Sequence, residues 1–162
     1  MNCDAVVHTT NSSLSLAGQC GSALSQAGGP SFRTEVNRIS STQSLRVAEA
    51  TISGSGALPC RFVIHVHSPT WNDTDALQNL EKAVKSCLDL AEKNKLVSVA
   101  FPSIASGSNS FPKQTSAQTI LRCIRNYYTV STTTKVMKQI YFVLYDMESI
   151  GIYTSELARL DQ

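Results

Sequence analysis

The chain has 162 residues, of which 42% are hydrophobic and 16% are charged, and its formal net charge at pH 7 is +2. This length is enough for one domain whose core needs no disulfide or metal to hold it together. Neither the near-neutral charge nor the scattered basic residues indicate a broad nucleic-acid-binding surface.

Five cysteines form an odd set without a Cys-x-x-Cys pair or a histidine at metal-ligand spacing. We therefore expect free thiols, most of them buried, in a reduced intracellular compartment. The N-terminus lacks the basic-then-apolar pattern of a secretory signal, and no apolar run is long enough to cross a membrane.

The first third of the chain predicts one strand and two helices. A short buried strand runs from Asp4 to His8, and after a polar loop comes the small-residue cluster Ala17 to Gly21. A short helix through Leu24 to Ala27 should end at Gly28-Gly29-Pro30. Helical spacing of apolar residues then predicts a second helix over Phe32 to Ser44.

The middle of the chain predicts a strand from Val47 to Ile52, a turn over Ser53 to Gly56 and a strand from Cys60 to Val66. Helical spacing follows, with Asp73, Thr74 and Asp75 expected to cap the helix and to supply negative charge at its start. The apolar face of this helix consists of Leu77, Leu80, Val84, Cys87, Leu88 and Ala91.

The last third predicts a strand from Val97 to Phe101, a helix from Lys113 to Tyr128 and a strand from Gln139 to Tyr145. A last helix should bury Ile150, Tyr153, Leu157 and Leu160. Strands that alternate with helices indicate a largely parallel sheet covered on both faces. Ligands of such sheets bind beyond the carboxyl ends of the strands, where the loops gather.

A loop of small residues, Ser103 to Ser110, separates the strand that ends at Phe101 from the next helix. A strand, such a loop and a helix in succession suit phosphate binding, because backbone N–H groups and a helix N-terminus can face one anion. An ordinary turn is the alternative, since Gly and Asn tolerate positive φ. On neighbouring loops, Tyr145 is a candidate to stack on a base, or simply to pack, and Asn11 to orient a sugar hydroxyl.

Other candidate residues carry weaker signals. His65 and His67 share one face of a strand, with His8 elsewhere, and no further metal ligand is spaced to join them, so we expect satisfied core or edge histidines. His67 as a general base is the alternative, but no carboxylate or nucleophile is placed to work with it. Cys20 lies near a helix N-terminus, where thiols become acidic, but no base is placed beside it, so backbone donation is the better use of its loop. Trp71 is most simply a packing anchor that also fixes the loop carrying Ser68.

Several segments together resemble a known family. They are Asp4 to Asn11, Ala27 to Phe32, Phe62 to His65, Ser68 to Trp71 and Ala100 to Ile104. On these segments the chain resembles the macrodomain family. Phe111 to Thr115 and Phe142 to Tyr153 are similar to the branch of that family found in the macro-type core histone variants.

The resemblance implies that residues 1–162 form a single α/β domain, a three-layer α/β/α sandwich with a mixed, largely parallel sheet. It implies ADP-ribose as the ligand, without cofactor or metal, with Asn11 at the proximal ribose and Ser68 and Tyr145 beside the adenosine. The diphosphate would lie between two walls of backbone donors. One wall is Gly18, Cys20 and Gly21, and the other is Ala105, Ser106, Gly107, Ser108 and Asn109.

Two departures from the family pattern leave affinity and adenine selectivity open. Ala17 stands where the first loop usually begins with Gly, and the family's N-terminal strands, with an Asp that reads adenine, would precede residue 1. Hydrolytic members usually have an acidic residue in the first loop, whereas Gln19 and Cys20 offer no carboxylate.

The resemblance therefore implies a non-catalytic module, monomeric when isolated, in the nucleus on chromatin. It would read free ADP-ribose or the terminal unit of ADP-ribosylated proteins, with a histone fold expected outside this chain. An ADP-ribosyl-protein hydrolase is one alternative. A domain without ligand that serves as a protein-interaction unit in chromatin is the other.

Overall fold

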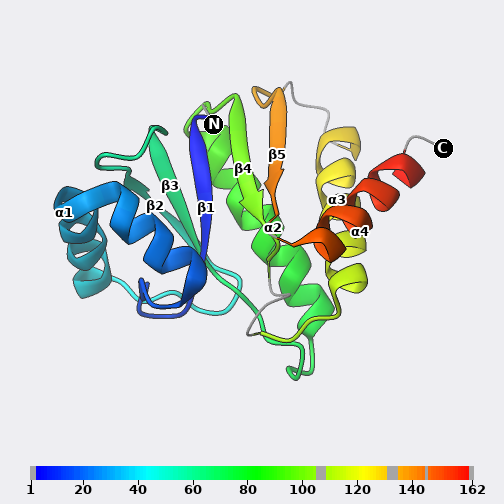
Figure 1. Ribbon diagram of the computed structural model, residues 1–162, viewed down its shortest axis with the longest axis horizontal. Coiled ribbons are helices and arrows are strands. Elements are labelled where there is room, and N and C mark those ends of the chain that lie inside the picture. Colours follow the sequence, from blue (N-terminus) through cyan, green and yellow to red (C-terminus); the bar gives the residue numbers. More distant parts are fainter. Residues whose placement is uncertain (1–2, 105–108, 131–134, 145, 161–162) are drawn as a thin grey trace.

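A single mixed sheet organises the protein. The computed structural model describes residues 3–104, 109–130, 135–144 and 146–160. Its strands lie in the order β2-β3-β1-β4-β5, with β2 antiparallel to β3 and the other pairs parallel (Figure 1). The bounds are β1 Ala5–Thr10, β2 Ala50–Gly54, β3 Phe62–His67, β4 Ser98–Pro102 and β5 Gln139–Val143. The predicted α/β fold with a mixed, largely parallel sheet is confirmed.

Helices cover both faces of this sheet and complete three layers. The described helices are α1 Gly18–Thr42, α2 Ala76–Lys93, α3 Lys113–Val130 and α4 Met147–Leu160. Phe32, Val36 and Ile39 of α1 pack on one face, whereas α2 and α3 pack on the other. Tyr153 of α4 packs against α3 and β5. Figure 1 shows α1 at the left end of the molecule and α3 and α4 at the right.

Asp4 ties together the amino ends of the three central strands. Its carbonyl oxygen accepts hydrogen bonds from Arg61 N (2.9 Å) and Phe62 N (3.0 Å), at the start of β3. Its backbone N–H donates to both the carbonyl and the hydroxyl oxygen of Ser98, and its carboxylate accepts from Val97 N at 2.8 Å, at the start of β4. These bonds fix the register of β1 between its two parallel neighbours.

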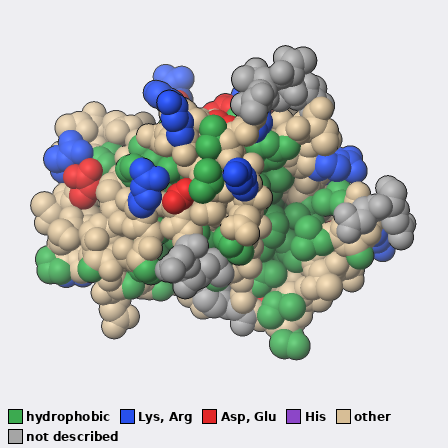
Figure 2. All heavy atoms as spheres, turned by 90° about the horizontal axis from the view of Figure 1, so that it is seen from above, with side chains coloured by type: hydrophobic (Ala, Val, Ile, Leu, Met, Phe, Trp, Pro, Cys, Tyr) green, Lys and Arg blue, Asp and Glu red, His purple; other side chains and the backbone are tan. Residues whose placement is uncertain are grey.

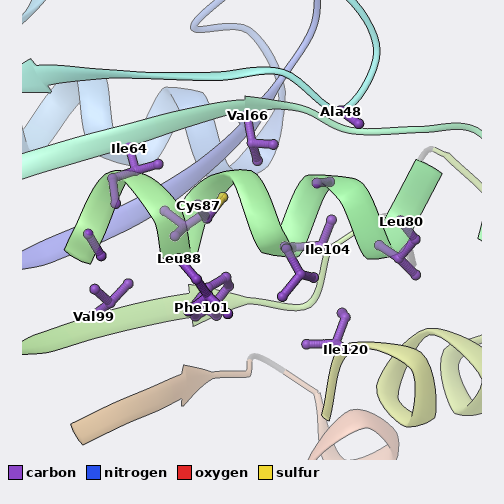
Figure 3. Packing of buried hydrophobic residues seen from close by; sticks show 14 of the residues in the cluster. Ala48, Ile64, Val66, Leu80, Cys87, Leu88, Val99, Phe101, Ile104 and Ile120 are labelled. Atoms are coloured by element: carbon purple, nitrogen blue, oxygen red, sulfur yellow. The ribbon is translucent and has the colours of Figure 1, made fainter. Parts of the chain in front are cut away.

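The larger part of the core lies between the sheet and α2. Leu88 and Cys87 of this helix project among side chains of β3 and β4, including Ile64 and Phe101 (Figure 3). The predicted apolar face is buried, with the exception of Leu77, which is 41% exposed. The position of the predicted cap is confirmed, but its side-chain hydrogen bond is not. Asp75 occupies the N-cap position without a side-chain cap bond, and the first turn contains no acidic residue.

The structure differs from the sequence prediction over α1. In place of two separate helices, one helix runs from Gly18 to Thr42 with a kink at Gly29, whose φ of 75° and ψ of −170° are not helical. Because glycine tolerates this conformation, the chain bends there and the helix resumes through Pro30. The small-residue cluster therefore forms the first turn of α1 and not a loop before it.

Two other element predictions need correction. The strand predicted from Val47 begins at Ala50 and includes Gly54, because Ala48 adopts a turn conformation with φ of 73°. In α4, Tyr153 is 2% exposed, but Ile150 and Leu157 are 42% and 43% exposed and do not line a buried face.

The surface and the thiols agree with the composition. Seen from the amino ends of the strands, Lys and Arg side chains lie singly and do not form one patch (Figure 2). All five cysteines are free, and Cys3, Cys60 and Cys87 are buried. None of the described helices is long and apolar enough to cross a membrane.

A close approach at Gly56 yields a stability prediction. Gly56 has φ of 59°, and a Cβ built there would lie 2.6 Å from the carbonyl oxygen of Gly28. We expect Gly56→Ala to lower the free energy of unfolding by roughly 2 to 4 kcal/mol, through left-handed strain and overpacking. Gly54→Ala is the matched control, because a Cβ there meets no atom within 4 Å. Urea unfolding that gives equal losses for the two variants would contradict this packing.

Candidate functional site

A cleft of about 860 Å³ opens at the carboxyl ends of β1, β3, β4 and β5. As the strand alternation predicts, the loops that follow these strands gather there. Thr9 and Thr10 come from the end of β1, Pro102 and Ser103 from the end of β4, and Leu144 from just after β5. The first turn of α1 and the starts of α3 and α4 complete the lining.

Asn11 presents its amide group in a fixed orientation at this cleft. Its Oδ1 accepts hydrogen bonds from Ser13 N (3.1 Å), Ser13 Oγ (3.0 Å) and Ser15 N (3.2 Å). Its Nδ2 makes no hydrogen bond with any described residue. Because the oxygen is held by the turn, the two amide hydrogens are left to donate to a ligand.

The N-terminus of α1 is the second set of donors. Ala17 occupies the N-cap position without a side-chain cap bond, and the first turn contains no acidic residue. The first N–H groups of any helix lack partners within it and carry the positive end of its dipole. Ala17, Gly18, Gln19, Cys20 and Gly21 all line the cleft. This helix end is therefore open to an anion.

Glycine is favoured at two positions of this turn for different structural reasons. Gly18 has φ of 86°, which favours glycine, and a Cβ there would meet no atom within 4 Å. At Gly21 a Cβ would lie 2.7 Å from the carbonyl carbon of Leu16, so only glycine lets the helix approach the preceding loop this closely. Ala17 has φ of −73°, an ordinary value for alanine, so its backbone conformation does not require glycine.

Ser68 and Asn109 lie on opposite loops and are joined to each other. Asn109 Nδ2 donates to the carbonyl oxygens of Ser68 (3.1 Å) and Pro69 (2.8 Å). Ser68 is 7% exposed, and its hydroxyl donates to the Pro69 carbonyl at 3.4 Å. Both residues line the cleft. Five further predicted contacts, Ala105, Ser106, Gly107, Ser108 and Tyr145, lie outside the described residues.

The charges at the cleft largely neutralise one another. Lys113 Nζ lies 3.0 Å from Asp146 Oδ2 and 3.2 Å from Glu148 Oε2, and these hydrogen bonds raise the pKa of Lys113. Hydrogen bonds from Ser149, and then from Lys113, lower the pKa of Asp146 to about 2. Sequence reasoning missed this pair, because the residues stand 33 positions apart and only the fold brings them together.

The thiol of Cys20 is not activated. Burial raises the pKa of Cys20 and outweighs the lowering effect of a backbone hydrogen bond at Thr9. This direction agrees with the expectation that Cys20 is not a nucleophile, and Cys20 lines the cleft.

His65 is a buried histidine with both ring nitrogens bonded, as the prediction of a satisfied core histidine has it. His8 is not elsewhere but faces His65 across the β1–β3 pair, with 2.8 Å between their Nδ1 atoms. The Ser53 hydroxyl donates to the Gly54 carbonyl, so it accepts from the Nε2–H of His65. The Nδ1 of His65 then accepts from the Nδ1–H of His8, which makes the His65 ring neutral. Burial lowers the pKa of His8 to about 4, and burial and then His8 lower that of His65 to about 3.

His67 lines the cleft but is also engaged. Its Nδ1 donates to the Leu45 carbonyl at 3.0 Å. Among the described residues no three His, Cys, Asp or Glu side chains are grouped as metal ligands. Trp71 packs edge-on against Phe111, with ring centroids 5.2 Å apart, as an anchor of the loop that carries Ser68.

Fold and cleft together define an α/β/α domain with an opening suited to a small anionic ligand. A family model described as Macro domain matches residues 7–120. Histone macroH2A1.1 of Capsaspora owczarzaki is 43% identical over 159 residues, which are 97% of this chain and 43% of that protein. The chain thus spans less than half the length of this relative.

Two further likenesses cover nearly whole proteins. O-acetyl-ADP-ribose deacetylase 1 of Pantoea vagans is 33% identical over 158 residues, which are 94% of this chain and 90% of that protein. A mutant of the Oceanobacillus iheyensis macrodomain with ADPR has a TM-score of 0.89 at 25% identity, over 99% of this chain and 88% of that chain. The chain belongs to the Macro domain family.

The buried histidine pair predicts a loss of stability in mild acid. Both folded pKa values lie below the unfolded value of 6.5, so the unfolded state binds more protons as the pH falls below 6.5. No charged group other than the pair itself contributes to either shift. We expect the free energy of unfolding to fall by roughly 3 kcal/mol between pH 7 and pH 5.

Urea unfolding at the two pH values measures this loss, since carboxylate protonation contributes mainly below about pH 5. In a His8→Gln variant one titrating ring is absent, so the loss should be about half as large. Equal stability of the unmodified chain at pH 7 and pH 5 would show that the pair is not held neutral.

Proposed function

We propose that this macrodomain binds ADP-ribose in the cleft through backbone donors at the start of α1. The observation that carries the proposal is the uncapped first turn of α1 at the cleft, beside the free amide nitrogen of Asn11. The helix end suits the diphosphate. Asn11 suits a ribose hydroxyl, since its two amide hydrogens can donate while the turn holds its oxygen.

The charge balance of the cleft supports recognition by N–H groups and not by cations. Lys113 is the one Lys or Arg among the described residues that line it, and two carboxylates already neutralise this ammonium. A phosphate oxygen bound by backbone N–H groups gains roughly 1.5 to 3 kcal/mol for each charge-assisted bond. Several such bonds supply the affinity that the missing cations do not.

The size of the cleft and the relatives agree with this ligand. A volume of about 860 Å³ lies in the range of sites that enclose a small molecule, about 300 to 1,000 Å³. The structural neighbour described above was solved with ADPR, and the Pantoea vagans relative is named for an ADP-ribose derivative.

The hydrogen bonds and the low pKa of Asp146 favour a binding role over hydrolysis. Asp146 is the one carboxylate among the described residues that line the cleft. Its oxygens bond to Ser149 N and Lys113 Nζ, and its pKa of about 2 makes it a weak base. An ADP-ribosyl-protein hydrolase stays the alternative function, because the Pantoea vagans relative is named as an enzyme that acts on an ADP-ribose derivative.

The cellular setting rests on the histone relative. Histone macroH2A1.1 matches 97% of this chain, so we propose that the protein lies in the nucleus, on chromatin. There it would read free ADP-ribose or the terminal unit of ADP-ribosylated proteins. A histone fold outside this sequence would supply the attachment to the nucleosome.

An ADP-ribose titration tests the binding proposal. We expect calorimetry to give a micromolar or lower Kd, which corresponds to about −8 kcal/mol or better. Asn11→Asp keeps an acceptor for the turn but replaces the amide donor by a carboxylate oxygen, so it should raise the Kd at least tenfold. Asn126→Asp, the same change at an exposed position of α3, is the control. No heat from the folded, unmodified chain would favour a domain that has no such ligand.

Incubation with a mono-ADP-ribosylated protein and with O-acetyl-ADP-ribose separates reader from hydrolase. Because Asp146, the one carboxylate among the described cleft residues, is already bonded to Ser149 and Lys113, we expect both substrates to stay intact at long times. The Pantoea vagans relative serves as the positive control for deacetylation. Release of product above the protein-free blank would establish the enzymatic alternative.

A further inference from the structure

The two loops that follow β3 and β4 are fastened to each other at the side of the cleft. The amide of Asn109 donates to two consecutive carbonyls, those of Ser68 and Pro69, and Trp71 N donates in return to the Asn109 carbonyl at 3.0 Å. We call Ser68, Pro69, Trp71, Asn109 and Phe111 the clasp. Three hydrogen bonds thus join Asn109 to the segment from Ser68 to Trp71.

The clasp is anchored at both ends in the rigid part of the fold. Phe111 is 2% exposed and belongs to the main core, and the Trp71 ring packs against it. On the other side Ser68 N donates to the Thr10 carbonyl at the end of β1 at 3.1 Å. The clasp therefore connects the ends of β1 and β3 with the segment that enters α3.

From these contacts we propose that Asn109 is a positioning residue, which sets the separation of the two loops and hence the width of the cleft. The proposal rests on the proposed ADP-ribose function. Asn109 was predicted to contact the ligand. That prediction concerned a wall of backbone donors, whereas both hydrogens of the side-chain amide are used on Ser68 and Pro69, so this nitrogen acts on the ligand through the loops.

The chemistry of the contact makes asparagine specific at this position. Two carbonyl oxygens face one nitrogen, and an NH₂ group supplies the two donors that they need. In Asn109→Asp a carboxylate oxygen of nearly the same shape would face the same two carbonyls. Repulsion between these oxygens would open the clasp, with Ser68 and Trp71 released from Asn109.

Trp71 gives this proposal its own readout, because it is the single tryptophan of the chain. It is 38% exposed while it packs on Phe111, so acrylamide quenching of its fluorescence reports whether the clasp is closed. Asn94→Asp is a matched control. The amide of Asn94 donates to the Leu90 carbonyl at 2.8 Å, at the end of α2 and away from the cleft.

The experiment measures acrylamide quenching and the Kd for ADP-ribose in the unmodified chain and in both variants. We expect Asn109→Asp to increase Trp71 quenching and to raise the Kd at least tenfold, whereas Asn94→Asp changes each by less than twofold. Thermal melts verify folding. If Asn109→Asp does not fold, Asn109→Ala, which removes the donors without adding charge, is judged by the same two readouts.

The outcomes separate the two proposals. No binding by the unmodified chain refutes the ADP-ribose function itself. If the unmodified chain binds, an unchanged Kd in an Asn109 variant with a loosened Trp71 refutes the positioning role. A raised Kd with unchanged Trp71 quenching also refutes it, because Asn109 would then act on the ligand directly.

Discussion

The pairing of β1 with parallel neighbours on both sides is the constraint on which the cleft depends. Asp4 sets this pairing with its carbonyl on β3 and its N–H and carboxylate at the start of β4. Once the amino ends are aligned, the carboxyl ends of β1, β3 and β4 fall side by side. The loops that follow them then bring Asn11, Ser68 and Asn109 to one opening. The residues that build the site are thus positioned by a contact at the opposite edge of the sheet.

Recognition through backbone donors has consequences that recognition through cations would lack. N–H groups of a helix end have fixed directions, so they select for the position of phosphate oxygens more than for total charge. Because Lys113 is already neutralised by Asp146 and Glu148, salt should weaken binding only modestly. Specificity then depends on how firmly the walls are held. Leu16 packs against Gly21 on one side, and the Asn109 amide holds the other.

The elements with strong periodicity could be predicted, whereas contacts between distant residues could not. The buried face of α2 follows from spacing, because Leu80, Val84 and Leu88 recur at helical intervals. Gly28 and Gly29 before Pro30 indicated a break in the helix. Whether the helix ends or bends there depends on tertiary contacts, such as the close approach of Phe32 to Gly28 and Gly56. The His8–His65 contact requires the strand order and register, which a single sequence does not reveal. The bonds from Asn109 to Ser68 and Pro69 could not be predicted for the same reason, since these partners belong to another loop.

In the proposed complex, the first N–H groups of α1 hold the phosphates of ADP-ribose. A ¹H–¹⁵N correlation spectrum recorded during an ADP-ribose titration tests it most directly, because each amide of Gly18, Gln19 and Cys20 gives its own signal. We expect these signals to shift strongly and to reach a plateau as ADP-ribose is added. Amides at the amino ends of the strands, such as that of Phe62, should shift little. Saturable binding that leaves the amides of Gly18, Gln19 and Cys20 unshifted would contradict it.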